Sequence, residues 1–253
     1  VYTVMLDQVK AAVFWSKNPE PFIKYLDEVD QRIPAYYFQF TLNDYELEGL
    51  EPGVPPLSER LDTFRRLSER LGPDRVVWRF DPIIFTGEQT PGQPNELLGR
   101  IERIGDTLQG FTQRMTFSFA RIEEYGKVQR RLKKLGISWS VPDREQRRTI
   151  VAALPEMTSE WGMSLHACAE EDDWSDLGVQ PGRCVDDELL ISMVDDREFL
   201  TFYRWENTLT GLERTGKPRV DPGQRKLCGC VVSKDIGEYN TCPHDCFYCY
   251  ANR

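Results

Sequence analysis

The last stretch of the 253-residue sequence carries three cysteines at a spacing suited to metal chemistry. Cys242, Cys246 and Cys249 form a C-x3-C-x2-C pattern, and the aromatic Tyr248 directly precedes the third cysteine. Three thiolates on one short loop can ligate three irons of a cubane [4Fe-4S] cluster, which leaves the fourth iron open to a substrate or cofactor. The spacing therefore predicts a reactive iron-sulfur site rather than a simple electron carrier.

A structural zinc knuckle is the competing interpretation of this loop. Zinc requires a fourth ligand, and His244 is the histidine that the loop offers. Because His244 lies between Cys242 and Cys246 in the sequence, its reach to a shared ion is poor. We therefore favour the iron-sulfur cluster over zinc.

The remaining cysteines have the count needed for a second, fully ligated site, either a [4Fe-4S] cluster or zinc. They are Cys168, Cys184, Cys228 and Cys230. Buried thiols are common in protein cores, so Cys168 and Cys184 also have a purely structural interpretation. We favour an auxiliary iron-sulfur cluster because the neighbouring open cluster needs a path for electrons.

Composition and charge narrow the class of protein. The formal net charge of −9 gives no sign of the excess of basic residues that proteins use to bind duplex nucleic acid. No run approaches the roughly 18 apolar residues of a membrane span, and no signal segment opens the sequence. We expect a cytoplasmic protein without a membrane partner, in which seven cysteines serve metal ligation rather than disulfides. The sequence begins with Val1 rather than Met, which is compatible with a missing N-terminal element.

Apolar runs alternate with helical patterns five times before Cys168. The expected strands cover residues 11–15, 35–41, 75–80, 114–119 and 162–168. The expected helices begin near residues 19, 56, 98, 125 and 144, and Pro155 should kink or split the last one. Residues 86–95 should form a surface loop. Because no glycine-rich nucleotide-binding spacing follows a strand, the alternation predicts an α/β fold, a partial or complete (β/α) TIM-type barrel.

We divide the chain into two parts on this basis. Residues 1–168 form the barrel-like core, and residues 169–253 form a cysteine-rich extension that binds the clusters and packs on the barrel mouth. The acidic run at residues 170–173 is interpreted as a solvated face.

Polar residues collect where the expected strands end, which is where α/β barrels carry their active sites. The candidates for substrate contact and catalysis are Lys17, Arg79, Asp81 and His166, and the candidates for cofactor contact are Gln39 and Ser118. Arg79 and Asp81 lie on one side of a strand, where they pair with each other or hold a ligand carboxylate. Each candidate also has a structural interpretation: His166 is then a core imidazole, and Arg79 with Asp81 a bridge that closes the barrel. The aromatic residues near them are expected in the core: Trp15, Tyr37, Trp78 and Phe80.

The C-x3-C-x2-C motif with its aromatic residue resembles that of the radical S-adenosylmethionine (SAM) superfamily. The resemblance implies that Cys242, Cys246 and Cys249 hold a [4Fe-4S] cluster, that SAM binds its open iron, and that the backbone around Tyr248 lies beside the adenine. Most members carry the motif near the N-terminus, whereas here it comes last. Such placement is similar to that of a bacterial family of unknown function, on residues 13–19, 36–41, 78–84 and 235–252. The terminal loop is then expected to fold back over the strand ends.

The resemblance implies a radical SAM enzyme that abstracts hydrogen from a small-molecule substrate and takes electrons from a donor such as flavodoxin or ferredoxin. Residues 16–19 are faintly similar to a stretch of the DNA photoproduct lyases, so a nucleic-acid enzyme is one alternative, which the acidic balance disfavours. A non-catalytic iron-sulfur protein that transfers electrons or senses redox state is the other.

Overall fold

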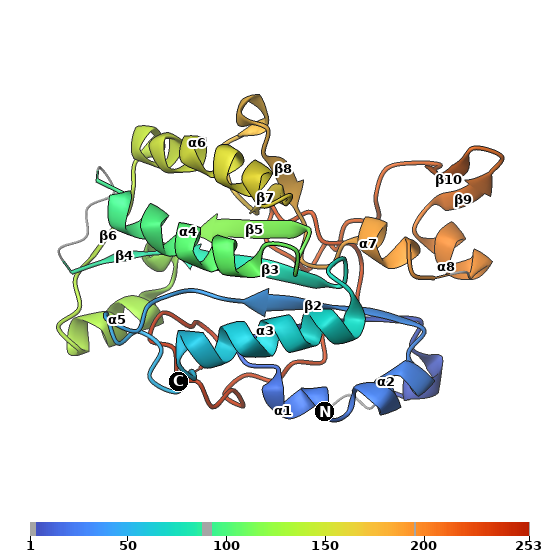
Figure 1. Ribbon diagram of the computed structural model, residues 1–253, viewed down its shortest axis with the longest axis horizontal. Coiled ribbons are helices and arrows are strands. Elements are labelled where there is room, and N and C mark those ends of the chain that lie inside the picture. Colours follow the sequence, from blue (N-terminus) through green and yellow to red (C-terminus); the bar gives the residue numbers. More distant parts are fainter. Residues whose placement is uncertain (1–3, 88–92, 195, 253) are drawn as a thin grey trace.

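The computed structural model describes residues 4–87, 93–194 and 196–252, and its centre is a six-stranded sheet (Figure 1). The strands lie in the order β1-β2-β3-β5-β7-β8, and every neighbouring pair is parallel. Their bounds are β1 Ala11–Ser16, β2 Ala35–Thr41, β3 Val76–Ile83, β5 Arg114–Phe119, β7 Ser164–Cys168 and β8 Gln180–Gly182. The predicted α/β class and the five expected strands are confirmed, and β8 is an addition.

The sheet does not close into a barrel within the described residues. β1 and β8 are its two edges, with no pairing between them. Closed barrels of this type contain eight strands, and six strands leave a gap. The complete barrel is therefore not formed. A short antiparallel pair, β4 Phe85–Thr86 with β6 Trp139–Ser140, lies outside the main sheet, and residues 88–92 of the expected surface loop are outside the described residues.

Six helices share one apolar core with the sheet. Their bounds are α1 Glu20–Ile23, α2 Leu26–Arg32, α3 Leu57–Leu71, α4 Asn95–Leu108, α5 Gly126–Lys134 and α6 Arg144–Glu160. The single helix expected from residue 19 is thus two short ones. Of the predicted kink or split at Pro155, the split does not occur, because α6 runs through that residue. Val151 and Leu154 are fully buried there, and this packing outweighs a loss of about 3 kcal/mol from an interior proline.

Alternation along the strands gives the sheet two unlike faces. Phe38 and Trp78 point into the apolar core beneath the helices. One residue further along, Gln39 and Arg79 point to the opposite side, which we call the polar face. Its members on four strands are Tyr37, Gln39, Arg79, Asp81, Arg114, Thr116, Ser118, His166 and Cys168.

Later segments of the chain cover the amino-terminal half of the polar face. α7 Asp187–Ile191, α8 Arg197–Phe202 and residues 230–231 contribute to a second apolar cluster with Tyr37 and Val77. The Tyr37 hydroxyl donates to the carbonyl oxygen of Cys184 over 2.7 Å and accepts from the Asp186 amide over 2.9 Å. Tyr37, Trp78 and Phe80 are buried as predicted. Trp15 is 51% exposed, so its expected place in the core is wrong.

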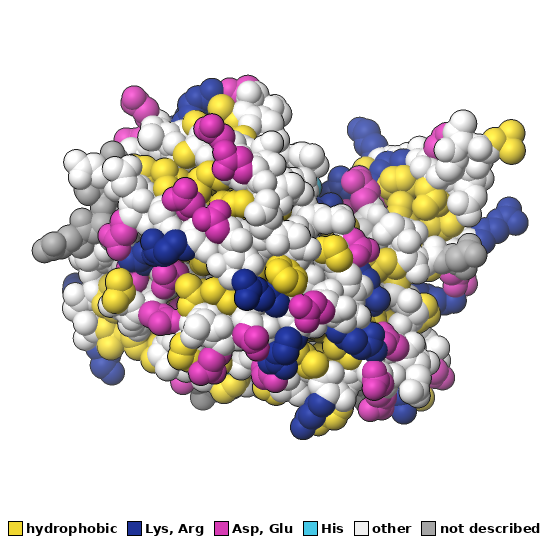
Figure 2. All heavy atoms as spheres, in the orientation of Figure 1, with side chains coloured by type: hydrophobic (Ala, Val, Ile, Leu, Met, Phe, Trp, Pro, Cys, Tyr) yellow, Lys and Arg dark blue, Asp and Glu magenta, His cyan; other side chains and the backbone are white. Residues whose placement is uncertain are grey.

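Figure 1 shows the two ends of the sheet occupied by different segments. α8 and the hairpin of β9 Trp205–Thr208 and β10 Gly211–Arg214 lie where the strands begin. The C-terminal segment, in red, runs to the end where the strands finish and lies beside α5. Figure 2 shows acidic and basic side chains interspersed over this view, with no stripe of one sign. Among the described helices, none has the length and apolar character needed to cross a membrane.

Candidate active site

The cysteine loop, residues 242–249, lies at the edge of the sheet where the parallel strands end. Asn43, just after β2, connects the two. Its Nδ2 lies 3.4 Å from the Tyr248 hydroxyl and 3.2 Å from the carbonyl oxygen of Asp81, near the end of β3. Its Oδ1 accepts from the Asp81 amide over 3.1 Å. This is the edge at which parallel α/β folds carry their active sites.

One arginine of α5 holds the backbone of the cysteine loop. The Arg131 guanidinium donates to four carbonyl oxygens: Cys246 at 3.2 Å, Phe247 at 3.2 Å, Cys249 at 3.1 Å and Asn252 at 2.6 Å. Hydrogen bonds from a charged donor are about twice as strong as neutral ones. A single side chain therefore anchors three carbonyl groups of the cysteine loop and one that follows it. Sequence reasoning missed Arg131, because nothing distinguishes it from its basic neighbours on the same helix.

Residues 50–53 form the wall on the other side of the cysteine loop. The Gly53 amide donates to the His244 carbonyl over 3.0 Å, and the Phe247 amide donates to the Leu50 carbonyl over 2.9 Å. A Cβ atom at Gly53 would lie 2.6 Å from the Pro243 carbonyl oxygen, so this approach requires glycine. His244 Nδ1 lies 2.9 Å from the Gly53 carbonyl oxygen, which engages the ring with the wall rather than with the thiols.

A buried polar cluster ties Tyr248 to the ends of the strands. The Tyr248 hydroxyl and the Lys17 ammonium both bond Oε1 of Glu51, the latter over 2.8 Å. The Lys17 ammonium also lies 5.5 Å from the centre of the Tyr248 ring. Burial raises the pKa of Tyr248 well above its usual value, so the phenol stays neutral. Lys17, expected to contact substrate, here neutralises Glu51 beneath the cysteine loop.

The three thiols of the loop differ in exposure. Cys242 is exposed, Cys246 is buried, and Cys249 accepts a hydrogen bond from the Ala251 amide over 3.4 Å. Burial, followed by the charge of Glu51, raises the pKa of Cys246 to about 12, while Lys17 opposes the shift. The same thiol is electrostatically coupled to those of Cys242 and Cys249.

The structure gathers the other four cysteines from three distant segments over the polar face. Cys168 Sγ lies 3.5 Å from Cys184 Sγ, and the Cys184 amide donates to Cys230 Sγ over 3.1 Å. A thiol hydrogen bond from Cys230 lowers the pKa of Cys228 to about 6. All seven cysteines are free. Within the described ranges, no group of three or more His, Cys, Asp or Glu side chains converges on the position of a single metal ion.

Arg79 is the centre of a network that joins the sheet to these cysteines. Its Nη1 lies 2.7 Å from Cys184 Sγ and 3.4 Å from Gln39 Oε1, and its Nη2 bonds Asp81. Ser118 donates to the other oxygen of Asp81. Hydrogen bonds from Cys168 and Cys230, with the Arg79 charge, hold the pKa of Cys184 well below its usual value. Four candidates for substrate or cofactor contact, Gln39, Arg79, Asp81 and Ser118, are thus brought together beside the predicted metal ligands.

His166 lies apart from this network. Its Nε2 lies 3.0 Å from the Ser164 hydroxyl, towards the start of β7, and its Nδ1 is buried without a hydrogen-bond partner among the described residues. Burial, followed by the charge of Arg114, lowers the pKa of His166 to about 4. This neutral imidazole fits the structural interpretation better than substrate contact.

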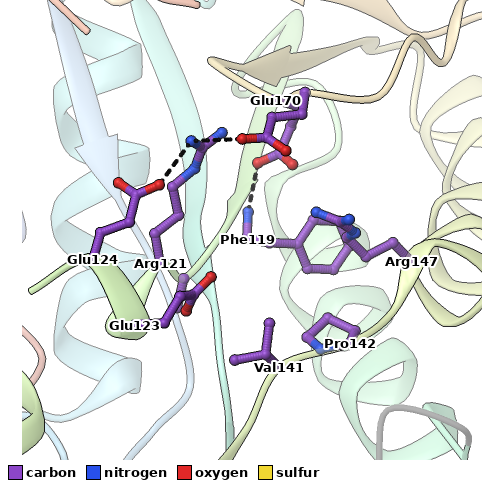
Figure 3. Close-up of a pocket in the computed structure, with 10 residues that line it drawn as sticks. Phe119, Arg121, Glu123, Glu124, Val141, Pro142, Arg147 and Glu170 are labelled. Atoms are coloured by element: carbon purple, nitrogen blue, oxygen red, sulfur yellow. Dashed lines mark hydrogen bonds and ion pairs between the residues drawn. The ribbon is translucent and has the colours of Figure 1, made fainter.

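Two adjoining hollows open over the ends of β5 and β7. The smaller, of about 50 Å³, is shown in Figure 3 between Phe119, Arg121 and Glu170. It has room only for water-sized molecules. The larger, of about 490 Å³, falls in the range of small-molecule sites. We call it the groove; its lining is Arg121, Glu124, Ala169, Glu171, Arg225, Lys226 and Leu227.

The acidic run at residues 170–173 is a solvated face only in part: Glu171 and Asp173 are exposed as expected, whereas Glu170 and Asp172 are not. The Glu170 carboxylate accepts from the Phe119 amide over 2.8 Å (Figure 3), and burial raises its pKa to about 7. Asp172 is also largely enclosed, with Arg144 at 3.0 Å and Arg147 at 3.3 Å. The enclosure of Glu170 and Asp172 could not be predicted from a run of four acidic residues, because it depends on the strand ends that lie beside the run.

Together these features define an α/β protein whose cysteine-rich C-terminal segment lies on the polar face and carboxyl edge of a parallel sheet. Residues 1–251 match the model of a family described as a domain of unknown function, DUF1848, and the chain belongs to that family. No curated protein matches it, and no solved structure does.

Proposed function

We propose that this protein is a radical SAM enzyme acting on a small molecule, and that its six-stranded sheet is a partial (β/α) barrel. One observation carries the proposal: the C-x3-C-x2-C loop lies at the carboxyl edge of the sheet, tied there by Tyr248, Asn43 and Arg131. A C-terminal motif thereby reaches the edge at which barrel enzymes act.

The residues of the loop fit a [4Fe-4S] cluster by their chemistry. Cys242, Cys246 and Cys249 come from one loop whose backbone Arg131 holds, and the thiol of Cys246 is coupled to the other two. A buried thiol with a raised pKa loses its proton when a cation binds, so metal binding and deprotonation are linked at Cys246. Three thiolates leave one iron open.

When bound, such a cluster supplies the electron that cleaves SAM and produces a 5′-deoxyadenosyl radical. The chain's own residues position the reactants. Tyr248, neutral and fixed by Glu51, would place the backbone around it beside the adenine of SAM, and Lys17 cancels the Glu51 charge there. Arg79, Asp81 and Ser118 form a rigid polar floor near the strand ends.

We further propose that Cys168, Cys184, Cys228 and Cys230 hold a second, auxiliary iron-sulfur cluster, with zinc as the alternative. Their mutual contacts over the polar face support this proposal. Four thiolates suit a fully ligated site. In the cytoplasm, an electron donor such as flavodoxin or ferredoxin would reduce the two iron-sulfur clusters.

Anaerobic reconstitution with iron and sulfide, followed by reduction in the presence of SAM, tests the proposal. We expect 5′-deoxyadenosine and methionine as products, and their loss in the Cys246→Ala variant. About eight irons per chain would indicate two clusters, and about four irons with one zinc a mixed pair. A reduced, iron-loaded protein that does not cleave SAM would rule out the enzyme and favour a non-catalytic iron-sulfur protein.

A further inference from the structure

The groove over the ends of β5 and β7 contains three cations that differ in their partners. Arg121 is fully engaged: its guanidinium donates to the Ala169 carbonyl over 2.6 Å and lies 3.2 Å from Glu124 and 3.6 Å from Glu171. Figure 3 shows Arg121 and Glu124 pointing towards each other. Arg225 and Lys226, by contrast, form no side-chain hydrogen bond or ion pair with any residue that the structure describes.

The cations that line the groove outnumber its acids. The lining has two acids, Glu124 and Glu171, against three cations, and both acids pair with Arg121 rather than with Arg225 or Lys226. Asp81, whose charge reaches Arg225, is bound by Arg79 and Ser118. The surplus of charge in the groove is therefore positive, although the whole chain carries a net charge of −9.

Arg225 is the more informative of the two cations. Its side chain is exposed, so a ligand can reach it, and its charge lies within electrostatic range of Tyr125 and Tyr250 as well as Cys168. The rings of Tyr125 and Tyr250 stack with their centres 5.1 Å apart, and Tyr250 directly follows Cys249. Arg225 thus links the groove electrostatically to Tyr250, the residue that follows the cysteine loop. An exposed guanidinium without a protein partner keeps its hydrogen-bond donors available, and an anion in the groove can accept from them.

We propose that the groove binds an anionic group, a carboxylate or a phosphate, of the small-molecule substrate, and that Arg225 and Lys226 hold this group. The assignment of the ligand as substrate rests on the proposed function; the anion site itself does not. A guanidinium can bind either anion through two parallel hydrogen bonds, and the adjacent ammonium adds a point charge. The groove's volume of about 490 Å³ accommodates a ligand of metabolite size.

Thermal unfolding of the protein as purified, with inorganic phosphate or acetate against chloride at equal ionic strength, tests the site. At ten times its dissociation constant, the better anion should raise the melting temperature by about 3 to 6 °C. The Arg225→Gln/Lys226→Gln variant should lose this rise. The Lys133→Gln/Lys134→Gln variant removes the same charge from exposed positions of α5 and should keep it.

The comparison of phosphate with acetate identifies the anion. Equal effects of chloride and both test anions on the wild-type protein would overturn the proposal, as would an unchanged rise in the Arg225→Gln/Lys226→Gln variant. Because binding is measured without reduction and without SAM, its failure is distinguishable from a failure of SAM cleavage. An anion response in a protein that does not cleave SAM would preserve the site and remove only its assignment to a radical SAM substrate.

Discussion

The guanidinium of Arg79 lies 2.7 Å from Sγ of Cys184, a residue 105 positions away in the sequence. This contact joins β3 to the loop after β8 and places a buried cation beside the four clustered cysteines. Arg79 is only 5% exposed and also bonds Gln39 and Asp81. It is therefore the side chain on which the polar face most depends.

Replacement of Arg79 by glutamine should destabilise the fold strongly. The Arg79→Gln variant leaves Asp81 without its cation, and breaking a buried pair in this way costs about 3 to 5 kcal/mol in the free energy of unfolding. The exposed pair of Arg66 with Glu20 offers a matched control, and Arg66→Gln should cost less than about 1 kcal/mol. Urea denaturation measures both. Equal losses would contradict a central role for Arg79.

Arg131→Ala should release the cysteine loop. Four carbonyls lose a charged donor, and we expect a loss of about 2 kcal/mol in stability and faster extraction of iron by a chelator from the reconstituted protein. Lys134→Ala, at an exposed position of the same helix, should change neither. Iron release at the wild-type rate from Arg131→Ala would show that the thiols alone hold the loop.

Gly53→Ala should displace the cysteine loop from its wall. The new Cβ meets backbone atoms of Pro243 and His244 at 2.6 to 2.9 Å, and backbone cannot move aside without moving the loop. We expect a lower iron content after reconstitution. Gly99→Ala, inside α4, meets only the end of Arg103 at 3.6 Å and should stabilise the protein by up to about 1 kcal/mol. If both variants load iron equally, the contact is not needed.

Glu170→Gln should change how stability depends on pH. Burial raises the pKa of Glu170 from 4.5 to about 7, so between these values the folded protein holds a proton that the unfolded chain has released. Its contribution is therefore full below pH 4.5 and is lost as pH rises to 7, by on the order of 3 kcal/mol. Denaturation of wild type and variant at pH 5 and 7.5 isolates this loss: from pH 5 to 7.5 the variant should gain stability relative to the wild type, by on the order of 3 kcal/mol. The same dependence in both proteins would refute the assignment.

His166 should make stability depend on pH in the opposite direction, and His166→Gln should remove this dependence. The pKa of His166 falls from 6.5 to about 4 on folding, so the unfolded chain binds a proton that the folded protein does not. Its contribution is full above pH 6.5 and is lost as pH falls to 4. The pH dependences that Glu170 and His166 give to stability oppose each other in the wild type. As pH rises from 5 to 7, the stability of the His166→Gln variant should therefore fall more steeply than that of the wild type. A shallower fall would contradict the buried neutral imidazole.

Local patterns in the sequence predicted the strands well but not the residues that hold the loop. Each strand has apolar residues in sufficient density to be found without tertiary information, as Phe38 and Trp78 illustrate. Arg131 and Gly53 carry no such pattern, since their roles are contacts with residues about 115 and 190 positions away. The misjudged Glu170 and Trp15 show the same limit, because exposure depends on which segments come to lie over a strand end.

The sequence by itself determined the α/β alternation, the polar residues on one side of the strands and the grouping of Cys242, Cys246 and Cys249. These depend on spacing along the chain, which is a local property. Only the tertiary structure decided that the sheet stays open, that the terminal loop reaches the carboxyl edge and that Cys168, Cys184, Cys228 and Cys230 meet. Contacts of this kind form when segments distant in the sequence pack against each other and bury apolar surface, and the spacing of residues along the chain does not encode that packing.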